Sequence, residues 1–260
     1  MGRSAAPDGG ESSRLRLYRV TAVVIRQRDL GEADRIVVLY TQERGKLSAV
    51  AKGVKRPRSK LAGGLQLFTH AEVLLAAGRT FDIVTQVRPL DPHYQLRTDL
   101  RRYAHASYLV ELLDVLTEER APDESVFALL VAALKGMNEE GDPATLVRGF
   151  ELKLLTRLGY GPELATCVSC GTEVEGGKIG FATAEGGVVC ARCLRSSGVG
   201  AISAVALRAL RDLVSMSPEE LVQRKLTPAA SEELARIMRP FVDYHLPRRL
   251  RSAAFLNGVG

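Results

Sequence analysis

The residues best suited to chemistry are four cysteines, which occur as two close pairs. Cys167 and Cys170 are separated by two residues, nineteen residues follow, and Cys190 and Cys193 repeat the two-residue spacing. This pattern is typical of a structural zinc site, because two thiolates on one tight turn can bind the same tetrahedral ion. Gly171, directly after the first pair, permits the positive φ that such a turn favours. Four thiolates leave no position for water, so we expect one structural Zn²⁺ per chain and no metal catalysis.

The sequence gives weaker support to other roles of the cysteines. Disulfides are rare in cytosolic chains, and a redox-active CxxC motif would need only one of the two pairs. A [4Fe–4S] cluster also takes four thiolates, although two pairs at this spacing are more typical of zinc. Iron therefore stays open as the alternative metal.

A second group of candidate residues is cationic. The densest positive charge lies between Lys46 and Lys60, and no acidic residue occurs from Lys46 until Glu72. Gly53 and Pro57 interrupt the segment, which predicts a loop and not a helical face. Cations spaced along a loop and a neighbouring strand can contact successive phosphates without reading bases. The predicted DNA-binding residues are Lys46, Lys52, Lys55, Arg56, Arg58, Lys60, Arg19, Arg26, Arg28 and Tyr18.

Aromatic side chains are dispersed among these cations, and stacking on such rings contributes roughly 1–3 kcal/mol per base in single-strand binders. Tyr40 and Phe81 lie inside apolar runs, which favours burial in the core. For Tyr18 and Phe68 the choice between core and stacking stays open.

The positive charge is concentrated in the first third of the chain. The 260 residues include 36 Lys+Arg and 30 Asp+Glu, a net charge of +6. Residues 1–90 hold 16 of the cations and 8 of the anions, whereas residues 91–260 hold 20 and 22, so the two parts carry +8 and −2. This asymmetry indicates an anionic partner, nucleic acid or an acidic membrane surface. The alternative is a solvated basic face that only aids solubility.

Neither a membrane span nor a catalytic motif is found in the sequence. The longest apolar run, residues 126–134, is too short for the roughly 20 residues that cross a bilayer, and the first residues lack the apolar core of a signal peptide. A cytoplasmic chain without membrane contact is therefore expected. No HExxH, GxSxG or deaminase HxE motif occurs, and the histidines are scattered. The chain is predicted not to be an enzyme.

The basic segment is embedded in a β-rich region. Alternation and β-branched residues predict five strands at residues 17–30, 35–42, 46–53, 72–77 and 81–87. Five strands without room for crossover helices favour a small antiparallel barrel. An OB barrel is the best match, although periodicity alone does not distinguish it from an SH3-like barrel.

After a linker marked by Pro89 and Pro92, the pattern becomes helical. Helices are predicted at residues 97–117, 124–138, 143–158, 203–214 and 229–244, the last kinked or broken at Pro240. The predicted fold class is α+β: an N-terminal five-stranded OB-like β-barrel and a C-terminal helical bundle with an inserted four-cysteine zinc finger. The expected domains are a flexible leader (1–13), the OB-fold DNA-binding domain (14–88), the helical domain (89–162 and 199–260) and the zinc-binding insertion (163–198).

Several short motifs occur in a characteristic order. They are GEADRIVVLYT at residues 31–41, Gly45-Lys46, AKGVKR at 51–56, LQLF at 65–68 and FELKLLTRLGYGP at 150–162, followed by the cysteine pairs. In order and spacing this set resembles the bacterial RecO family of DNA-repair proteins over nearly the whole chain. The leader is longer than the family needs. Many relatives keep only some of the cysteines, which implies that zinc serves stability more than function.

The resemblance implies a non-enzymatic recombination mediator in the cytoplasm, associated with the nucleoid. Such proteins bind single- and double-stranded DNA, anneal complementary strands, and work with RecR to load RecA onto strands coated by single-strand-binding protein. Two other readings of the sequence compete with this one. The first is a zinc-containing nucleic-acid enzyme, such as a nuclease or modification enzyme, and the second is a purely structural adaptor.

Overall fold

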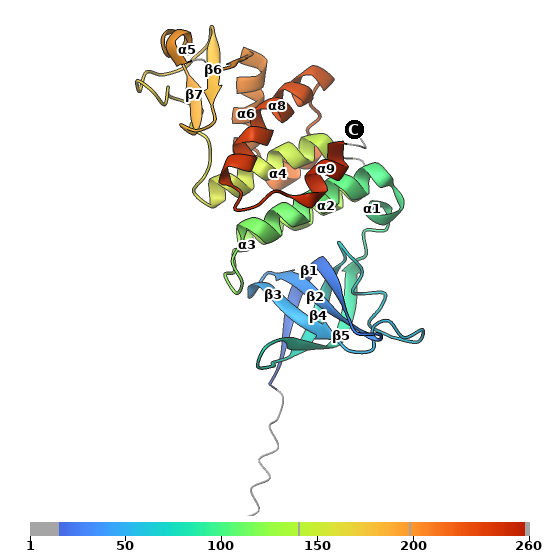
Figure 1. Ribbon diagram of the computed structural model, residues 1–260. Coiled ribbons are helices and arrows are strands. Elements are labelled where there is room, and N and C mark those ends of the chain that lie inside the picture. Colours follow the sequence, from blue (N-terminus) through green and yellow to red (C-terminus); the bar gives the residue numbers. More distant parts are fainter. Residues whose placement is uncertain (1–15, 140, 198, 258–260) are drawn as a thin grey trace, which may run out of the picture.

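The computed structural model describes residues 16–139, 141–197 and 199–257 (Figure 1). The predicted leader, residues 1–13, lies outside this range. In Figure 1 a barrel forms one end of the molecule, helices occupy the middle, and the cysteine-bearing segment lies at the opposite end. The predicted fold class is thereby confirmed: a closed five-stranded barrel, a helical part, and four cysteines clustered in an inserted segment.

The barrel closes in the strand order β1-β2-β3-β5-β4, and β3 and β5 form its one parallel pair. Its interior is built by alternation, as expected from the sequence. Val20, Ala22 and Val24 of β1 point into the barrel core, whereas Val23 and Ile25 pack outside it, in the core shared with the helices. β1 is therefore buried on both faces along this stretch. The strands are β1 (Leu17–Leu30), β2 (Asp34–Thr41), β3 (Gly45–Ala51), β4 (His70–Ala76) and β5 (Asp82–Asp91).

The last strand is longer than predicted. Strand β5 continues to Asp91, past Pro89, which the sequence placed in a linker. Pro89 pairs with Ala71 beside an irregularity in the β4–β5 register. A bulge of this kind accommodates a residue that cannot donate a ladder hydrogen bond.

The helical part packs on one side of the barrel (Figure 1). Asp99 has extended backbone angles, and its carboxylate accepts a hydrogen bond from the Arg102 N–H at 2.9 Å. The predicted helix over 97–117 is therefore divided at this N-cap into two helices. The predicted break at Pro240 is not found, because α8 runs through this residue. The helices of this part are α1 (Gln95–Thr98), α2 (Leu100–Leu116), α3 (Glu124–Asn138), α4 (Pro143–Arg157), α6 (Ala204–Ser215), α7 (Pro218–Gln223), α8 (Pro228–His245) and α9 (Arg251–Asn257).

The cysteine-bearing segment contains a small sheet and one short helix. Strand β6 pairs with β7 in a hairpin and with β8 on its other side. Arg211 of α6 attaches this segment to the bundle, since its guanidinium donates to the carbonyl oxygens of Leu164 (2.6 Å) and Val174 (2.7 Å). The elements are β6 (Ile179–Ala182), β7 (Gly187–Val189), α5 (Ala191–Ser197) and β8 (Ala201–Ile202).

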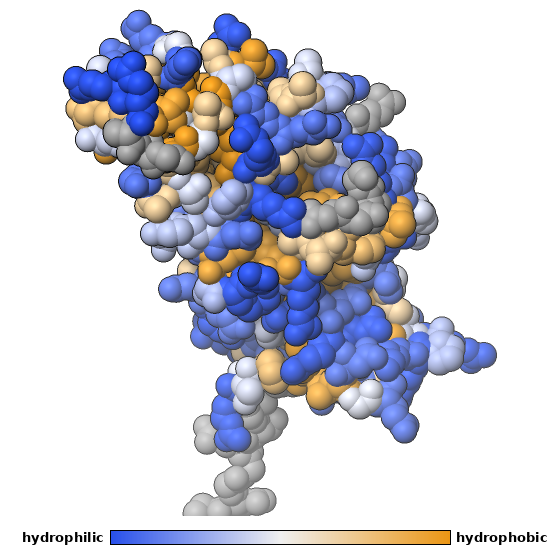
Figure 2. Space-filling model, turned by 45° about the horizontal axis from the view of Figure 1, so that its top comes forward, coloured by the Kyte–Doolittle hydropathy of each residue, from blue (hydrophilic) through white to orange (hydrophobic). Residues whose placement is uncertain are grey.

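The barrel and the helices meet through close backbone contacts. Gly45 has a φ of +64°, and a Cβ atom at this position would lie 2.3 Å from the carbonyl oxygen of Ala121. The Arg120 N–H donates to the carbonyl oxygen of Lys46 at 2.8 Å. Hydrophilic residues cover most of the barrel on the face shown in Figure 2. None of the described helices is both long and apolar enough to cross a bilayer.

Candidate metal centre and candidate nucleic-acid interface

The two cysteine pairs converge on one point. Their four Sγ atoms all lie within 4.8 Å of one another, although the pairs are far apart in sequence. The first pair sits on a tight turn: the N–H groups of Cys170 and Gly171 both point at the carbonyl oxygen of Cys167, at 3.3 and 2.8 Å. Gly171 has the expected positive φ, +70°. The second pair is presented by the start of α5.

The cluster has the dimensions of a tetrahedral metal site. Zn–S bonds of about 2.3 Å place the sulfurs of a tetrahedron about 3.8 Å apart. The Sγ atoms of Cys170 and Cys190 are 3.8 Å apart, and the four cysteines form no disulfide with one another. Hydrogen bonds from Thr172 lower the pKa of Cys170 to about 5, whereas the hydrogen bond with Cys170 and burial raise the pKa of Cys193 to about 12, so Cys170 is the readier of the two to form the thiolate that binds metal. The four cysteines can therefore hold one metal ion.

The predicted basic segment forms an exposed loop at one end of the barrel. We call residues 52–60 the basic loop. The Gly53 N–H donates to the Asp34 carboxylate at 2.7 Å, and the Lys55 N–H donates to the carbonyl oxygen of Ala33 at 3.0 Å, which fixes the loop to the β1–β2 turn. The Lys55 ammonium pairs with Asp29 at 2.9 Å. The loop's other cations are exposed: Lys52, Arg56, Arg58 and Lys60.

Lys46, also predicted to bind DNA, lies apart from this loop in the interior. Only 8 % of its surface is exposed. Its Nζ lies 3.2 Å from the Asp114 carboxylate and donates to the carbonyl oxygens of Asp114 (2.5 Å) and Thr117 (2.6 Å). All three contacts are on or next to helix α2. In this arrangement Lys46 connects the barrel to the bundle, and its ammonium is engaged by helix α2 and the residue that follows it.

Tyr18 and Arg19 lie on a different part of the barrel. The Tyr18 hydroxyl donates to Asp82 at 2.5 Å, and burial together with this hydrogen bond raises the pKa of Tyr18 to about 12. The Arg44 guanidinium covers the Tyr18 ring, 4.1 Å from its centroid. The ring face that would stack on a base is thus occupied on that side. Arg19 pairs with Glu72 at 3.4 Å.

Arg26 and Arg28 line a groove on the outside of the barrel, with a volume of about 490 Å³. In the β1–β2 register, Arg26 lies opposite Val38 and Arg28 opposite Ile36, so strand pairing sets these side chains next to one another. We call this the barrel groove; its lining residues are Arg26, Gln27, Arg28, Ile36, Val38, Ser48, Phe81 and Arg251.

The distribution of the aromatic residues between the core and the surface differs from the prediction. Tyr40 is buried as expected, but against the helices and not inside the barrel. Phe68 is fully buried and packs edge-on against Tyr103, with ring centroids 5.6 Å apart. Phe81, expected in the core, is only half-buried and lines the barrel groove. Of the four rings, Phe81 is therefore the one placed in a basic groove.

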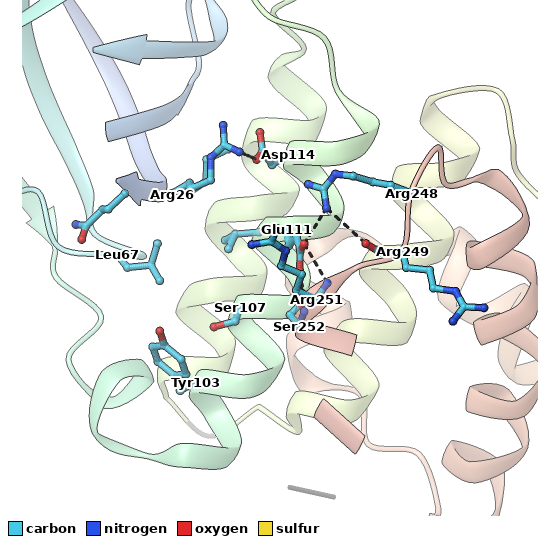
Figure 3. A pocket seen from close by; sticks show the side chains of 13 residues that line it. Arg26, Leu67, Tyr103, Ser107, Glu111, Asp114, Arg248, Arg249, Arg251 and Ser252 are labelled. Atoms are coloured by element: carbon cyan, nitrogen blue, oxygen red, sulfur yellow. Dashed lines mark hydrogen bonds and ion pairs between the residues drawn. The ribbon is translucent and has the colours of Figure 1, made fainter. Parts of the chain in front are cut away.

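Sequence reasoning missed a second hollow, between the barrel and the bundle (Figure 3). This domain cleft has a volume of about 720 Å³ and is lined by β1, α2 and the start of α9. Arg248 pairs with Glu111 of α2 at 3.2 Å, and Arg26 reaches from the barrel to Asp114 at 3.2 Å. The run Arg248-Arg249-Leu250-Arg251 was a visible signal, which the balanced charge of residues 91–260 concealed.

Comparison with known proteins agrees with this architecture. The family model "Recombination protein O N terminal" matches residues 15–93, and "Recombination protein O C terminal" matches residues 97–254. The chain is 40 % identical over 248 residues to the DNA repair protein RecO of Symbiobacterium thermophilum, covering 94 % of this chain and 98 % of that protein. It is 38 % identical to the RecO of a Roseiflexus species, over 95 % of this chain and 87 % of that protein. On two family models and these near full-length matches, the chain belongs to the RecO family of DNA repair proteins.

Proposed function

We propose that this protein binds single- and double-stranded DNA through its barrel and anneals complementary strands without catalysing a covalent reaction. The observation that carries the proposal is the basic loop, which exposes four cations that form no ion pair within the described residues: Lys52, Arg56, Arg58 and Lys60. The relatives are named for DNA repair. In the cell this activity would serve recombination mediation: with RecR, the protein helps RecA to load on strands coated by single-strand-binding protein.

The mechanism follows from electrostatics. Two complementary strands repel each other through their phosphates, and cations on a loop lower this repulsion when they hold one strand while a second approaches. Lys and Arg contacts to phosphate carry no sequence information, so any complementary pair can be annealed. Annealing of any complementary pair requires such contacts, which do not depend on the base sequence.

The ion proposed for the cysteine cluster is Zn²⁺, in a structural role. All four candidate ligands are cysteines, their spacing is typical of a zinc site, and four thiolates would leave no position for water. When bound, zinc would fix the two turns and α5 relative to one another, which a sheet of three short strands does poorly alone. The remaining metal hypothesis, an iron–sulfur cluster, is distinguished by its visible absorbance.

The histidines support a non-enzymatic role. Burial lowers the pKa of each of them. Two have structural partners: Nδ1 of His93 lies 2.8 Å from the carbonyl oxygen of Phe68, and Nδ1 of His105 lies 2.7 Å from that of Arg101. The other two, His70 and His245, pack against aromatic rings. Nuclease or modification chemistry would need a base with a nearby nucleophile or an open metal position.

The test combines a binding and an annealing assay. A variant with Lys52, Arg56, Arg58 and Lys60 changed to Ala is compared with a control in which four exposed cations elsewhere are changed to Ala: Lys178, Arg195, Arg208 and Lys225. We expect the loop variant to lose annealing and to show a smaller salt dependence of single-strand affinity, by about 0.7 in log–log slope for each lost contact. The control should match the natural protein.

Three results would overturn the proposal. Unchanged affinity and slope in the loop variant would exclude the loop as the interface. Absence of DNA binding by the natural protein at low salt would favour the structural adaptor. Metal-dependent cleavage of the strands would favour the enzyme.

A further inference from the structure

The C-terminal helix contributes to the barrel groove. Arg251, the first residue of α9, lines the groove together with Arg26 and Arg28 of β1 and also lines the domain cleft. In Figure 3 the side chains of Arg251 and Arg248 extend toward the barrel side of the cleft, whereas Arg249 points away. The two hollows thus join at Arg26, Gln27 and Arg251, which line both.

The backbone around Arg251 is held firmly by one carboxylate. Glu111 of α2 accepts hydrogen bonds from the N–H groups of Arg251 (3.1 Å) and Ser252 (2.8 Å) and from the Ser252 hydroxyl (2.6 Å). It also pairs with the Arg248 guanidinium at 3.2 Å. The Glu111 carboxylate is therefore occupied by backbone N–H groups and by the Arg248 guanidinium. The Arg251 side chain makes no ion pair within the described residues and is exposed.

The charges of the barrel groove are unbalanced. No acidic side chain lines it among the described residues. Arg26 faces Asp114, but Asp114 also carries the contact with Lys46, so one carboxylate serves two cations. Arg28 is exposed and, like Arg251, has no ion-pair partner in the described part of the chain. Concentrated positive charge without a counterion favours an anionic ligand.

The floor of the groove is apolar. Ile36 and Val38 lie opposite Arg28 and Arg26 on strand β2, and half-buried Phe81 adds an aromatic surface. Guanidinium groups bind phosphate oxygens bidentately, and an aromatic ring or apolar floor accepts the face of a base. A strand of nucleic acid offers both chemistries at once. An acidic peptide offers carboxylates to the arginines but no phosphate and no base.

The groove also continues the basic loop. Arg28 directly precedes Asp29, whose carboxylate binds Lys55 of the loop at 2.9 Å. A strand that contacts the loop can therefore run along β1 past Arg28 and Arg26 to the C-terminal helix. The path crosses from a part of the sequence with net charge +8 to one with net charge −2.

We propose that Arg251 and Arg28 form a phosphate clamp for a DNA single strand, closed by α9 over the barrel groove, with Phe81 contacting a base. The proposal rests on the proposed function and deepens it, because it assigns the helical part of the chain a direct DNA contact. Glu111 is a positioning residue in this arrangement: it fixes the backbone from which Arg251 reaches the groove.

The experiment measures single-strand affinity as a function of salt for the single variants Arg28→Ala and Arg251→Ala, and for the double variant. The matched control is Arg208→Ala, an exposed arginine on α6 without an ion pair in the described residues. We expect each clamp variant to reduce the log–log slope by about 0.7 and the double variant by about 1.4. Arg251→Lys should restore most of the slope, since it keeps the charge. Thermal unfolding should be unchanged, because neither side chain forms an ion pair or a hydrogen bond within the described residues.

The outcomes separate the clamp from the proposed function. If the natural protein binds DNA and the clamp variants keep its slope, the clamp is wrong and the loop interface stands. If the loop variant also binds normally, the proposed function itself fails. Loss of binding to polyglutamate without change in DNA binding would identify an acidic protein as the groove's ligand and overturn the clamp.

Discussion

The Nζ atom of Lys46 lies 3.2 Å from the Asp114 carboxylate, in the buried junction between β3 and α2. Asp114 also receives Arg26 at 3.2 Å, so two barrel cations meet on one helical carboxylate. Both cations were predicted from the sequence to face DNA. The pairing instead gives Lys46 a part in holding the barrel against the bundle, while Arg26 keeps a position at the edge of the barrel groove.

Replacing Lys46 by Ala should destabilise the protein without altering its DNA interface. Removing one partner of a buried ion pair costs about 3–5 kcal/mol, and we expect the lower end, near 3 kcal/mol, because Arg26 remains on Asp114. Urea unfolding gives this value, and Lys52→Ala should lie within about 0.5 kcal/mol of the natural protein. Folded Lys46→Ala should keep the salt slope of DNA binding. A reduced slope with unchanged stability would instead place Lys46 in the interface.

The elements of this fold could be predicted because their signals are local. Alternation in β1 sorts Val20, Ala22 and Val24 to one side, and the spacing of the cysteine pairs reflects the geometry of a single ion. Helix α3 was predicted with its exact bounds, since Asp123 caps it with hydrogen bonds to the N–H groups of Ser125 and Val126. Each of these signals acts over a few residues.

The parts that could not be predicted depend on distant partners. Lys46 is buried because it contacts Asp114, which lies 68 residues further along the chain. The barrel groove is completed by Arg251, 225 residues beyond Arg26. A single sequence shows that a lysine follows a glycine in a strand, but not which helix will cover it. The net charge of residues 91–260 likewise did not reveal the cluster of arginines around Arg251, because acidic residues elsewhere in this part balance it.

Asp82 should make stability depend on pH. Burial alone would raise its pKa, but hydrogen bonds from the Tyr18 hydroxyl and the Gly78 N–H, with Arg120 nearby, lower the net value. A carboxyl with a lowered pKa in the folded state stabilises the fold above its unfolded pKa of about 3.9, and this contribution is lost as pH falls through the folded pKa.

Asp82→Asn is therefore expected to lose about 1–3 kcal/mol at pH 7 and to differ less from the natural protein as pH falls below about 4. Urea unfolding between pH 7 and pH 3 measures the difference. Tyr18→Phe, which removes one donor to Asp82, should show a smaller effect with the same sign. A difference that stays constant across this range would exclude Asp82 as the titrating group.

Zinc should bind stoichiometrically and act locally. We expect one Zn²⁺ per chain in the natural protein and none in Cys190→Ser, whereas Ser169→Ala, in the same turn, should retain the metal. Elemental analysis gives both values. Chelation should increase amide hydrogen exchange in residues 163–202 and leave the barrel strands protected, because the barrel has its own core. Annealing should persist in EDTA. Loss of annealing on chelation would give the metal a role beyond stability.

We propose that a small hollow in the helical domain docks an acidic, apolar tail of single-strand-binding protein. It has a volume of about 270 Å³, is lined by apolar side chains of α3 and α6, and has Lys153 and Arg157 at its margin. Lys153 donates to the carbonyl oxygens of Val214 and Met216. Arg157 is exposed and pairs with Asp123 at 2.6 Å. Arg148 on the same helix pairs with buried Glu151 at 2.7 Å, and only 11 % of its side chain is exposed, so it offers little to a partner.

Arg157→Ala should therefore impair annealing only on coated strands. Loss of a charge at the margin of an apolar site removes attraction for an acidic tail, and we expect about a fivefold weaker capture of strands coated by single-strand-binding protein, or about 1 kcal/mol. Bare strands should anneal at the natural rate, because Arg157 is on α4 and the basic loop is on the barrel. Arg208→Ala serves as the control in both assays. Equal slowing on bare and coated strands would show that Arg157 contacts DNA, and no slowing on either would remove this hollow as the docking site.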